Sequence, residues 1–109
     1  QVHDAFVIEE LEYYELLDFC RDGEAEKLVE EGATSLGGRI PFNTDGGGLC
    51  NNHPANRGGM TKVIEAVRQL RGEAHPAVQV KSCDLALAHG TGGSLATRHA
   101  SATLILEAK

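Results

Sequence analysis

The sequence predicts an α/β fold, in which amphipathic helices alternate with strands and pack against a mixed sheet. Apolar side chains recur at helical spacing over residues 5–20 and 60–72, whereas residues 78–89 and 101–107 hold the alternating or continuous apolar runs of strands. A glycine-rich stretch divides the chain between these halves. A length of 109 residues corresponds to one domain.

The composition indicates an ordinary folded protein and argues against several classes of function. Hydrophobic residues make up 41% of the chain and charged residues 24%, which disfavours disorder. A net charge of −6 disfavours nucleic acid or an anionic membrane as the main partner. We expect neither a membrane span nor a signal segment. Three cysteines without a dense framework favour free thiols, so the sequence predicts a soluble cytoplasmic domain.

The first elements are predicted to be two helices and a short strand. Residues 5–20 mix acidic and apolar side chains at helical spacing, and Asp4 stands where a carboxylate can accept first-turn amides. Residues 23–32 predict a shorter helix that ends at Gly32. The segment RIPFN, residues 39–43, predicts a short strand.

Residues 33–59 are predicted to form a long functional loop. They hold more than half of the chain's 13 glycines. A loop of this length is uncommon in a compact domain without a function. A flexible linker is the alternative, but a linker would not normally concentrate Cys50, His53 and Arg57 among its glycines.

The second half is predicted as helix, strand, tight loop and strand. The helix spans residues 60–72, and Val63, Val67 and Leu70 define its apolar face. Gly72 ends this helix.

A strand over residues 78–89 follows, then a glycine-bearing turn over residues 89–99, then a strand over residues 101–107. The glycines of residues 90–93 could aim backbone N–H groups at a negative oxygen, as in an oxyanion hole. A plain hairpin between two strands fits the same spacing equally well.

Three histidines lie where regular structure meets a loop: His3 in HDAF, His53 in NNHP and His89 in HGTGG. Imidazole gives and takes protons near neutral pH, although a lone histidine is more often a packing or capping residue. Pro54 restricts the backbone before it and so favours a fixed presentation of the His53 ring. We expect the three imidazoles to converge beside exposed main-chain amides.

Other ligand classes match the sequence poorly. Cys50 and His53 have the spacing C-x-x-H, but no second pair stands at ligand spacing, so no metal site is expected. Neither G-x-G-x-x-G after a strand nor G-K-[ST] is present, which argues against a phosphate loop for nucleotides.

Taken together, these boxes resemble the C-terminal half of the thiolase superfamily. HDAF at residues 3–6 looks like the N-E-A-F box in the His-Asp variant of sterol-carrier and lipid-transfer thiolases. Residues 43–59 look like the N-x-x-G-G…G-H-P block, and HGTGG at residues 89–93 stands in the place of C-x-G. The resemblance covers essentially all of residues 1–109. It implies a C-terminal thiolase-like segment of a longer subunit, whose N-terminal half lies outside this chain.

The resemblance also implies catalytic roles. His53, the histidine of the G-H-P box, would polarise a thioester carbonyl and assist a nucleophilic cysteine in the upstream half. His3 would help to form an oxyanion hole. His89 would take the place of the C-x-G cysteine, the usual second acid or base.

The same resemblance implies a substrate-binding side formed by Asn43 and by the backbone at Gly92 and Gly93. The sequence departs from the family at the second catalytic thiol. Neither His89 nor Ala5, the two positions where a cysteine would stand, holds one.

Three functions therefore stay open for the parent subunit. The first is acyl transfer with thiolytic C–C cleavage of acyl-CoA thioesters. The second is retro-aldol cleavage of a β-hydroxyacyl-CoA, together with a partner that carries a zinc ribbon and an OB-fold. The third is a non-catalytic CoA-binding subunit. A coenzyme A thioester is the expected substrate, with no covalently bound cofactor, and the family implies a homodimer. The isolated chain is expected to be inactive.

Overall fold

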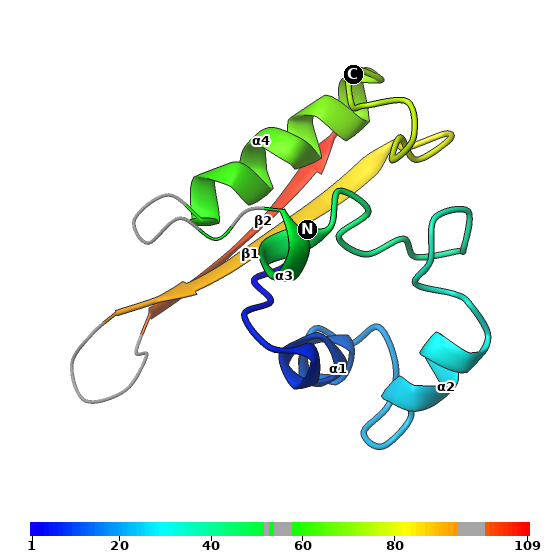
Figure 1. Cartoon of the computed structure of the whole chain (residues 1–109), viewed down its shortest axis with the longest axis vertical. Helices are drawn as coiled ribbons and strands as arrows, with labels where there is room; N and C mark the ends of the chain where they lie inside the picture. The colour runs from blue at the N-terminus through cyan, green and yellow to red at the C-terminus, as the bar shows by residue number, and fades with distance from the viewer. Residues whose placement is uncertain (52, 54–57, 94–99) are drawn as a thin grey trace.

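The computed structural model describes residues 1–51, 53, 58–93 and 100–109. In this part of the chain, helices and a strand pair follow one another as an α/β fold (Figure 1), which confirms the predicted class. The elements are α1 (Val7–Leu16), α2 (Ala25–Glu30), α3 (Gly47–Cys50), α4 (Gly58–Arg71), β1 (Leu85–Gly92) and β2 (Ala100–Glu107).

The strand β1 is the centre of the sheet. On one edge it pairs antiparallel with β2, in a register that runs from Leu85 opposite Glu107 to Gly92 opposite Ala100. On the other edge the first residues of the chain run parallel to it, with a bridge between Val2 and His89. The helix α4 lies lengthwise along the strand pair (Figure 1). The sheet is therefore mixed, and a helix covers one of its faces.

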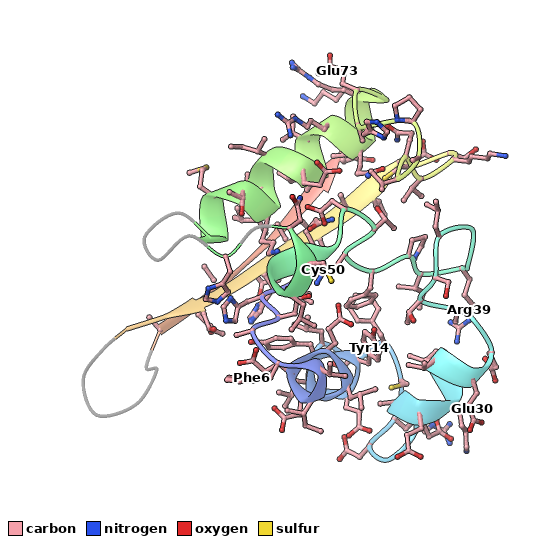
Figure 2. The ribbon with its side chains drawn as sticks, in the orientation of Figure 1. Phe6, Tyr14, Glu30, Arg39, Cys50 and Glu73 are labelled. Carbon is pink, nitrogen blue, oxygen red and sulfur yellow. The ribbon has the colours of Figure 1, made fainter. Side chains whose placement is uncertain are left out.

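Helices α1 and α2 enclose a separate apolar cluster away from the sheet. Tyr14 and Leu28 are buried there, and the ring of Phe42 packs edge-on against Tyr14 at a centroid distance of 4.5 Å. Figure 2 shows Tyr14 pointing from α1 toward the loop that follows α2. Phe42 therefore ties this loop to the helices.

The beginning of α1 corrects the prediction for Asp4. The helix starts at Val7, and the carboxylate of Glu9 accepts the amides of Ala5 and Phe6 at 2.6 and 3.0 Å. The Asp4 carboxylate instead accepts the amide of Gly48, far along the chain. A residue within the helix thus takes the capping role that the sequence assigned to Asp4.

The helix α4 is close to its predicted bounds, but it turns its other face inward. Its buried side chains are Lys62, Glu65, Ala66 and Gln69. The predicted apolar face is half-buried at Val63, Val67 and Leu70, and Met60 and Ile64 beside it are 61% and 44% exposed. The periodicity was sufficient to place the helix, whereas its orientation follows from polar contacts with distant loops.

Two predicted strands differ from the structure. The strand of residues 78–89 begins only at Leu85, because the side chain of Gln69 bonds the backbone of Val78 and Val80 at 3.0 and 2.7 Å. Residues 39–43 form no strand, because their amides bond back to the turn after α2.

The glycine-bearing turn predicted over residues 89–99 is also different in its first part. Residues 89–92 belong to β1, and residues 94–99 lie outside the described residues. Among the helices that the structure describes, none has the length and apolar character to cross a membrane.

Candidate functional site

The structure brings the imidazoles of His3 and His53 into contact. Their ring centroids lie 5.2 Å apart, with the planes tilted by 49°. His53 is exposed, while His3 is half-buried beside the sheet. Residues that are 50 positions apart in the sequence thus present two imidazoles at one place.

His89 joins this pair through its backbone. Its carbonyl accepts the amide of His3 at 3.0 Å, and its amide donates to the carbonyl of Gln1 at 2.8 Å. The His89 ring contacts Tyr13, with centroids 5.0 Å apart. Two of the three predicted rings therefore touch, and the third belongs to the neighbouring strand.

The environment of His89 favours the neutral imidazole. The residue is 7% exposed, and its Nδ1 lies 2.7 Å from Oγ1 of Thr103 on β2. Burial lowers the pKa of His89 below its ordinary value of 6.5. A neutral imidazole has one donor nitrogen and one acceptor nitrogen, and the acceptor nitrogen is the one that can take up a proton.

A cradle of glycines holds the segment that leads to His53. A Cβ atom at Gly47 would clash with Oδ2 of Asp4, and one at Gly48 would stand 2.9 Å from Oδ1 of Asp4. The same Cβ at Gly48 would come within 3.2 Å of Cδ2 of His53. Gly47 also has a φ of +59°, which side chains rarely adopt. The glycines are therefore required by the close approach of Asp4 and His53.

Asn43 holds the segment that carries His3. Its Oδ1 accepts the amide of Val2 at 2.8 Å, and its Nδ2 donates to the carbonyl of Val2 and to Oε1 of Glu10, both at 3.0 Å. The residue is 8% exposed and has a φ of +40°. These contacts use the amide for folding, and the predicted contact of Asn43 with substrate stays a prediction.

Glu10 is a partly buried acid next to Asp4 that the sequence analysis did not single out. Burial raises its pKa above the ordinary 4.5, and the nearby charge of Asp4 acts in the same direction. Hydrogen bonds from Asn43 and Tyr14 act in the opposite direction. In the sequence, Glu10 is one of several acids on the first helix, so nothing local distinguishes it.

The remaining predicted residues lie at the end of β1. Gly92 pairs with Ala100, and Gly93 follows the strand with a φ of +102°. Their contact with substrate stays a prediction. Arg57 and Pro54, which the sequence analysis placed beside His53, lie outside the described residues.

The cysteines show no sign of a metal centre. Cys20, Cys50 and Cys83 are free thiols, and Figure 2 shows Cys50 on α3. Burial raises the pKa of Cys20 and of Cys83, which disfavours the reactive thiolate. Within residues 1–51, 53, 58–93 and 100–109, no three side chains of His, Cys, Asp or Glu are grouped to hold a metal ion.

Several characterised proteins are similar to this chain over most of its length. The benzoylsuccinyl-CoA thiolase subunit BbsB of Thauera aromatica is 37% identical over 107 residues, which cover 94% of this chain and 28% of that protein. Sterol carrier protein 2 of Bos taurus is 38% identical over 97 residues, covering 87% and 18%. The acetyl-CoA acetyltransferase of Methanothermobacter thermautotrophicus is 37% identical over 94 residues, covering 86% and 24%.

This chain therefore spans 18–28% of the length of these three relatives. The family model described as thiolase C-terminal domain-like matches residues 1–108. Together with the α/β architecture, this match shows that the chain belongs to the thiolase C-terminal domain-like family.

Proposed function

We propose that this chain is the C-terminal segment of a longer thiolase-like subunit that acts on acyl-CoA thioesters. Two of the similar proteins are a thiolase subunit and an acetyl-CoA acetyltransferase by name. Because the chain spans 18–28% of these relatives, the nucleophile and the other walls of the substrate site would come from the rest of the subunit.

Exposed apolar side chains support this assignment to a larger subunit. On α1, Val7 and Leu16 are 68% and 73% exposed, and on β2, Ile105 is 72% exposed. Apolar surface on several elements at once is typical of faces that another part of a protein covers. We infer that the rest of the subunit packs on these faces.

The contact between the rings of His3 and His53 is the observation that carries the proposed chemistry. When a thioester carbonyl reacts, negative charge develops on its oxygen, and positioned donors stabilise that charge. We assign the donor facing the thioester oxygen to His53, which is exposed, and the second donor to His3. Two imidazoles in contact can face one oxygen, directly or through a water molecule.

The proton transfer falls to His89 in this proposal. In C–C bond formation, the reverse of thiolysis, a base removes the proton at the carbon next to the thioester carbonyl, and in thiolysis the same group returns this proton. By the resemblance of the boxes, His89 stands in the place of the usual C-x-G cysteine, and Ala5 stands where sterol-carrier-type enzymes carry a cysteine in the His-Asp box. The buried, neutral imidazole of His89 has the protonation state that a base requires. Gly92, Gly93 and Asn43 would line the substrate-binding side.

Retro-aldol cleavage of a β-hydroxyacyl-CoA is the second candidate, favoured by the same absence of a thiol at positions 5 and 89. In this reaction a base removes the hydroxyl proton, the β carbon becomes a carbonyl as the bond between the α and β carbons breaks, and the enolate that remains takes up a proton to give the shorter acyl-CoA. The enolate oxygen would lie against His53 and His3, and no nucleophilic cysteine is required. A partner with a zinc ribbon and an OB-fold would belong to this second reaction.

For either reaction we propose a cytoplasmic homodimer. A non-catalytic CoA-binding subunit is the third candidate function.

The two reactions are separated by their need for free coenzyme A. Thiolysis of a 3-ketoacyl-CoA consumes added CoA, whereas retro-aldol cleavage of a β-hydroxyacyl-CoA proceeds without it. In the complete protein, we expect His53→Ala to lower kcat by at least about tenfold in the active assay. His75→Ala, which removes an exposed histidine after α4, is the matched control and should retain the rate.

An unchanged rate in His53→Ala would remove this residue from the mechanism. We expect the isolated 109-residue chain to show no turnover with either substrate. Turnover by the isolated chain would contradict the assignment of the nucleophile and pocket walls to the rest of the subunit.

A further inference from the structure

Asp4 lies where three segments of the chain meet, and it is 1% exposed. Its Oδ1 accepts the amide of Gly48 in the glycine loop, and the same atom lies 3.7 Å from Nζ of Lys62 on α4. In the sequence it directly follows His3. One carboxylate therefore connects the segment of His3, the loop that leads to His53, and the helix behind both.

The glycine loop fits around this carboxylate and around the His53 ring at once. The position of a Cβ at Gly48 would be 2.9 Å from Oδ1 of Asp4 and 3.2 Å from Cδ2 of His53. A shift of the loop away from Asp4 would therefore also move the wall against which the His53 ring rests. The rings of His3 and His53 lie 5.2 Å apart beside this packing.

We propose that Asp4 is a positioning residue, which sets the place of the His53 ring relative to His3 by holding the amide of Gly48. The inference rests on the proposed function of these two histidines. Asp4 does not touch the thioester in this proposal, because its Oδ1 is already engaged by Gly48 and Lys62. Its effect should appear in kcat, because a small misplacement of a catalytic group slows the reaction much more than it weakens binding.

Lys62 balances the charge of Asp4. The side chains of Lys62 and Asp4 are 3% and 2% exposed, so both charges are shielded from water. Nζ of Lys62 has no hydrogen-bond acceptor among the described residues, and it forms an ion pair with Asp4. Removing one partner would leave an uncompensated buried charge. The test therefore has to neutralise both residues together.

Two double variants of the complete protein isolate the hydrogen bond from the charge. Asp4→Asn with Lys62→Met keeps an oxygen that can accept the amide of Gly48, whereas Asp4→Ala with Lys62→Met does not. We expect the Ala double variant to lose at least about tenfold in kcat, with KM changed by less than about threefold. The Asn double variant should recover most of that loss. Asp22→Ala, which removes an exposed carboxylate before α2, serves as the control.

Gly48→Ala tests the same packing without altering a charge. Its new Cβ would meet both Asp4 and His53, so kcat should again fall by at least about tenfold. This variant decides the question if the double variants do not fold. An unchanged kcat in Gly48→Ala, or equal kcat values in the two double variants, would overturn the positioning role.

Wild type and His53→Ala are measured in the same assay. If His53→Ala loses activity while the two double variants have equal kcat values, the positioning role of Asp4 fails and the proposed function stands. If His53→Ala is as fast as wild type, the proposed function fails, and the positioning role falls with it.

Discussion

Replacing Asn43 distinguishes a residue that holds the fold from one that binds substrate. Its side chain pairs with both backbone groups of Val2, which is 0% exposed, and with Glu10. The strand β1 lies on the other side of Val2, so the Asn43 side chain supplies the hydrogen bonds to the Val2 backbone that a second neighbouring strand would otherwise supply. The change Asn43→Ala would leave the buried N–H and C=O of Val2 without these partners.

The expected cost follows from the groups left unpaired. A buried polar group without a partner costs about 1–3 kcal/mol, and Asn43→Ala would leave two such groups unpaired, the N–H and the C=O of Val2. The φ of +40° at position 43 adds to the loss of stability, because alanine in the left-handed region costs about 1 kcal/mol or more. Asn43→Ala should therefore lower the free energy of unfolding by at least about 3 kcal/mol.

Denaturant unfolding and amide hydrogen exchange measure this effect. The Val2 amide should exchange at least about a hundredfold faster in Asn43→Ala, since each 1.4 kcal/mol corresponds to a factor of about ten. Asn51→Ala, an exposed asparagine at the end of α3, should change stability by less than about 0.5 kcal/mol. If Asn43→Ala matches this control in stability and raises only KM for the acyl-CoA, Asn43 acts through contact with substrate alone, and its role in holding the backbone of Val2 is wrong.

Two further predictions concern the surroundings of Asp4. Glu10→Gln should stabilise the protein at pH 7 and progressively less toward acid pH, measured by denaturant unfolding across pH. Because folding raises the pKa of Glu10, the protonated side chain stabilises the protein below about pH 4.5, and this stabilisation is lost as the pH rises through the folded-state pKa. Equal effects of Glu10→Gln at pH 4 and pH 7 would contradict this assignment. Gly47→Ala should destabilise the protein by at least about 2 kcal/mol more than Gly23→Ala. Both positions have positive φ, but only the Cβ at Gly47 would meet the Asp4 carboxylate, so equal losses of stability would remove the argument for close approach.

The local pattern of the sequence was sufficient for α1, α4 and most of the strand pair. The helices follow from apolar side chains at helical spacing, and Gly72 follows the last turn of α4 as predicted. The structure differs at residues 78–84, where the side chain of Gln69 bonds the backbone in place of a strand partner. Such a contact between a side chain and a distant backbone leaves no period in the sequence.

The face that α4 turns inward could not be predicted from the sequence, for a related reason. Periodicity identifies Val63, Val67 and Leu70 as one face, but it does not say what covers that face. In this chain the buried face carries Lys62 and Glu65. The burial of Lys62 depends on Asp4, which lies 58 positions away in the sequence and which the local pattern presented as a helix cap.

The candidate site could be predicted in part, because its histidines lie in three separate short boxes, HDAF, NNHP and HGTGG. The rings of His3 and His53 are in contact, whereas the ring of His89 lies against Tyr13. The sequence indicates which residues can carry protons, but the direction in which a strand side chain points depends on register. The parallel pairing of Val2 with His89 sets that register. The segment before α1 that makes this pairing is too short to show a strand pattern in the sequence.

A double-variant cycle at His3 and His53 tests the central claim most directly. The measurement is kcat/KM of the complete protein for its acyl-CoA substrate in wild type, His3→Ala, His53→Ala and the double variant. If the two imidazoles stabilise one oxygen, the double variant should lose less than the product of the single losses, with a coupling of at least about 1 kcal/mol. Losses that multiply without coupling, or full activity in either single variant, would contradict the claim that these two rings act on the same thioester.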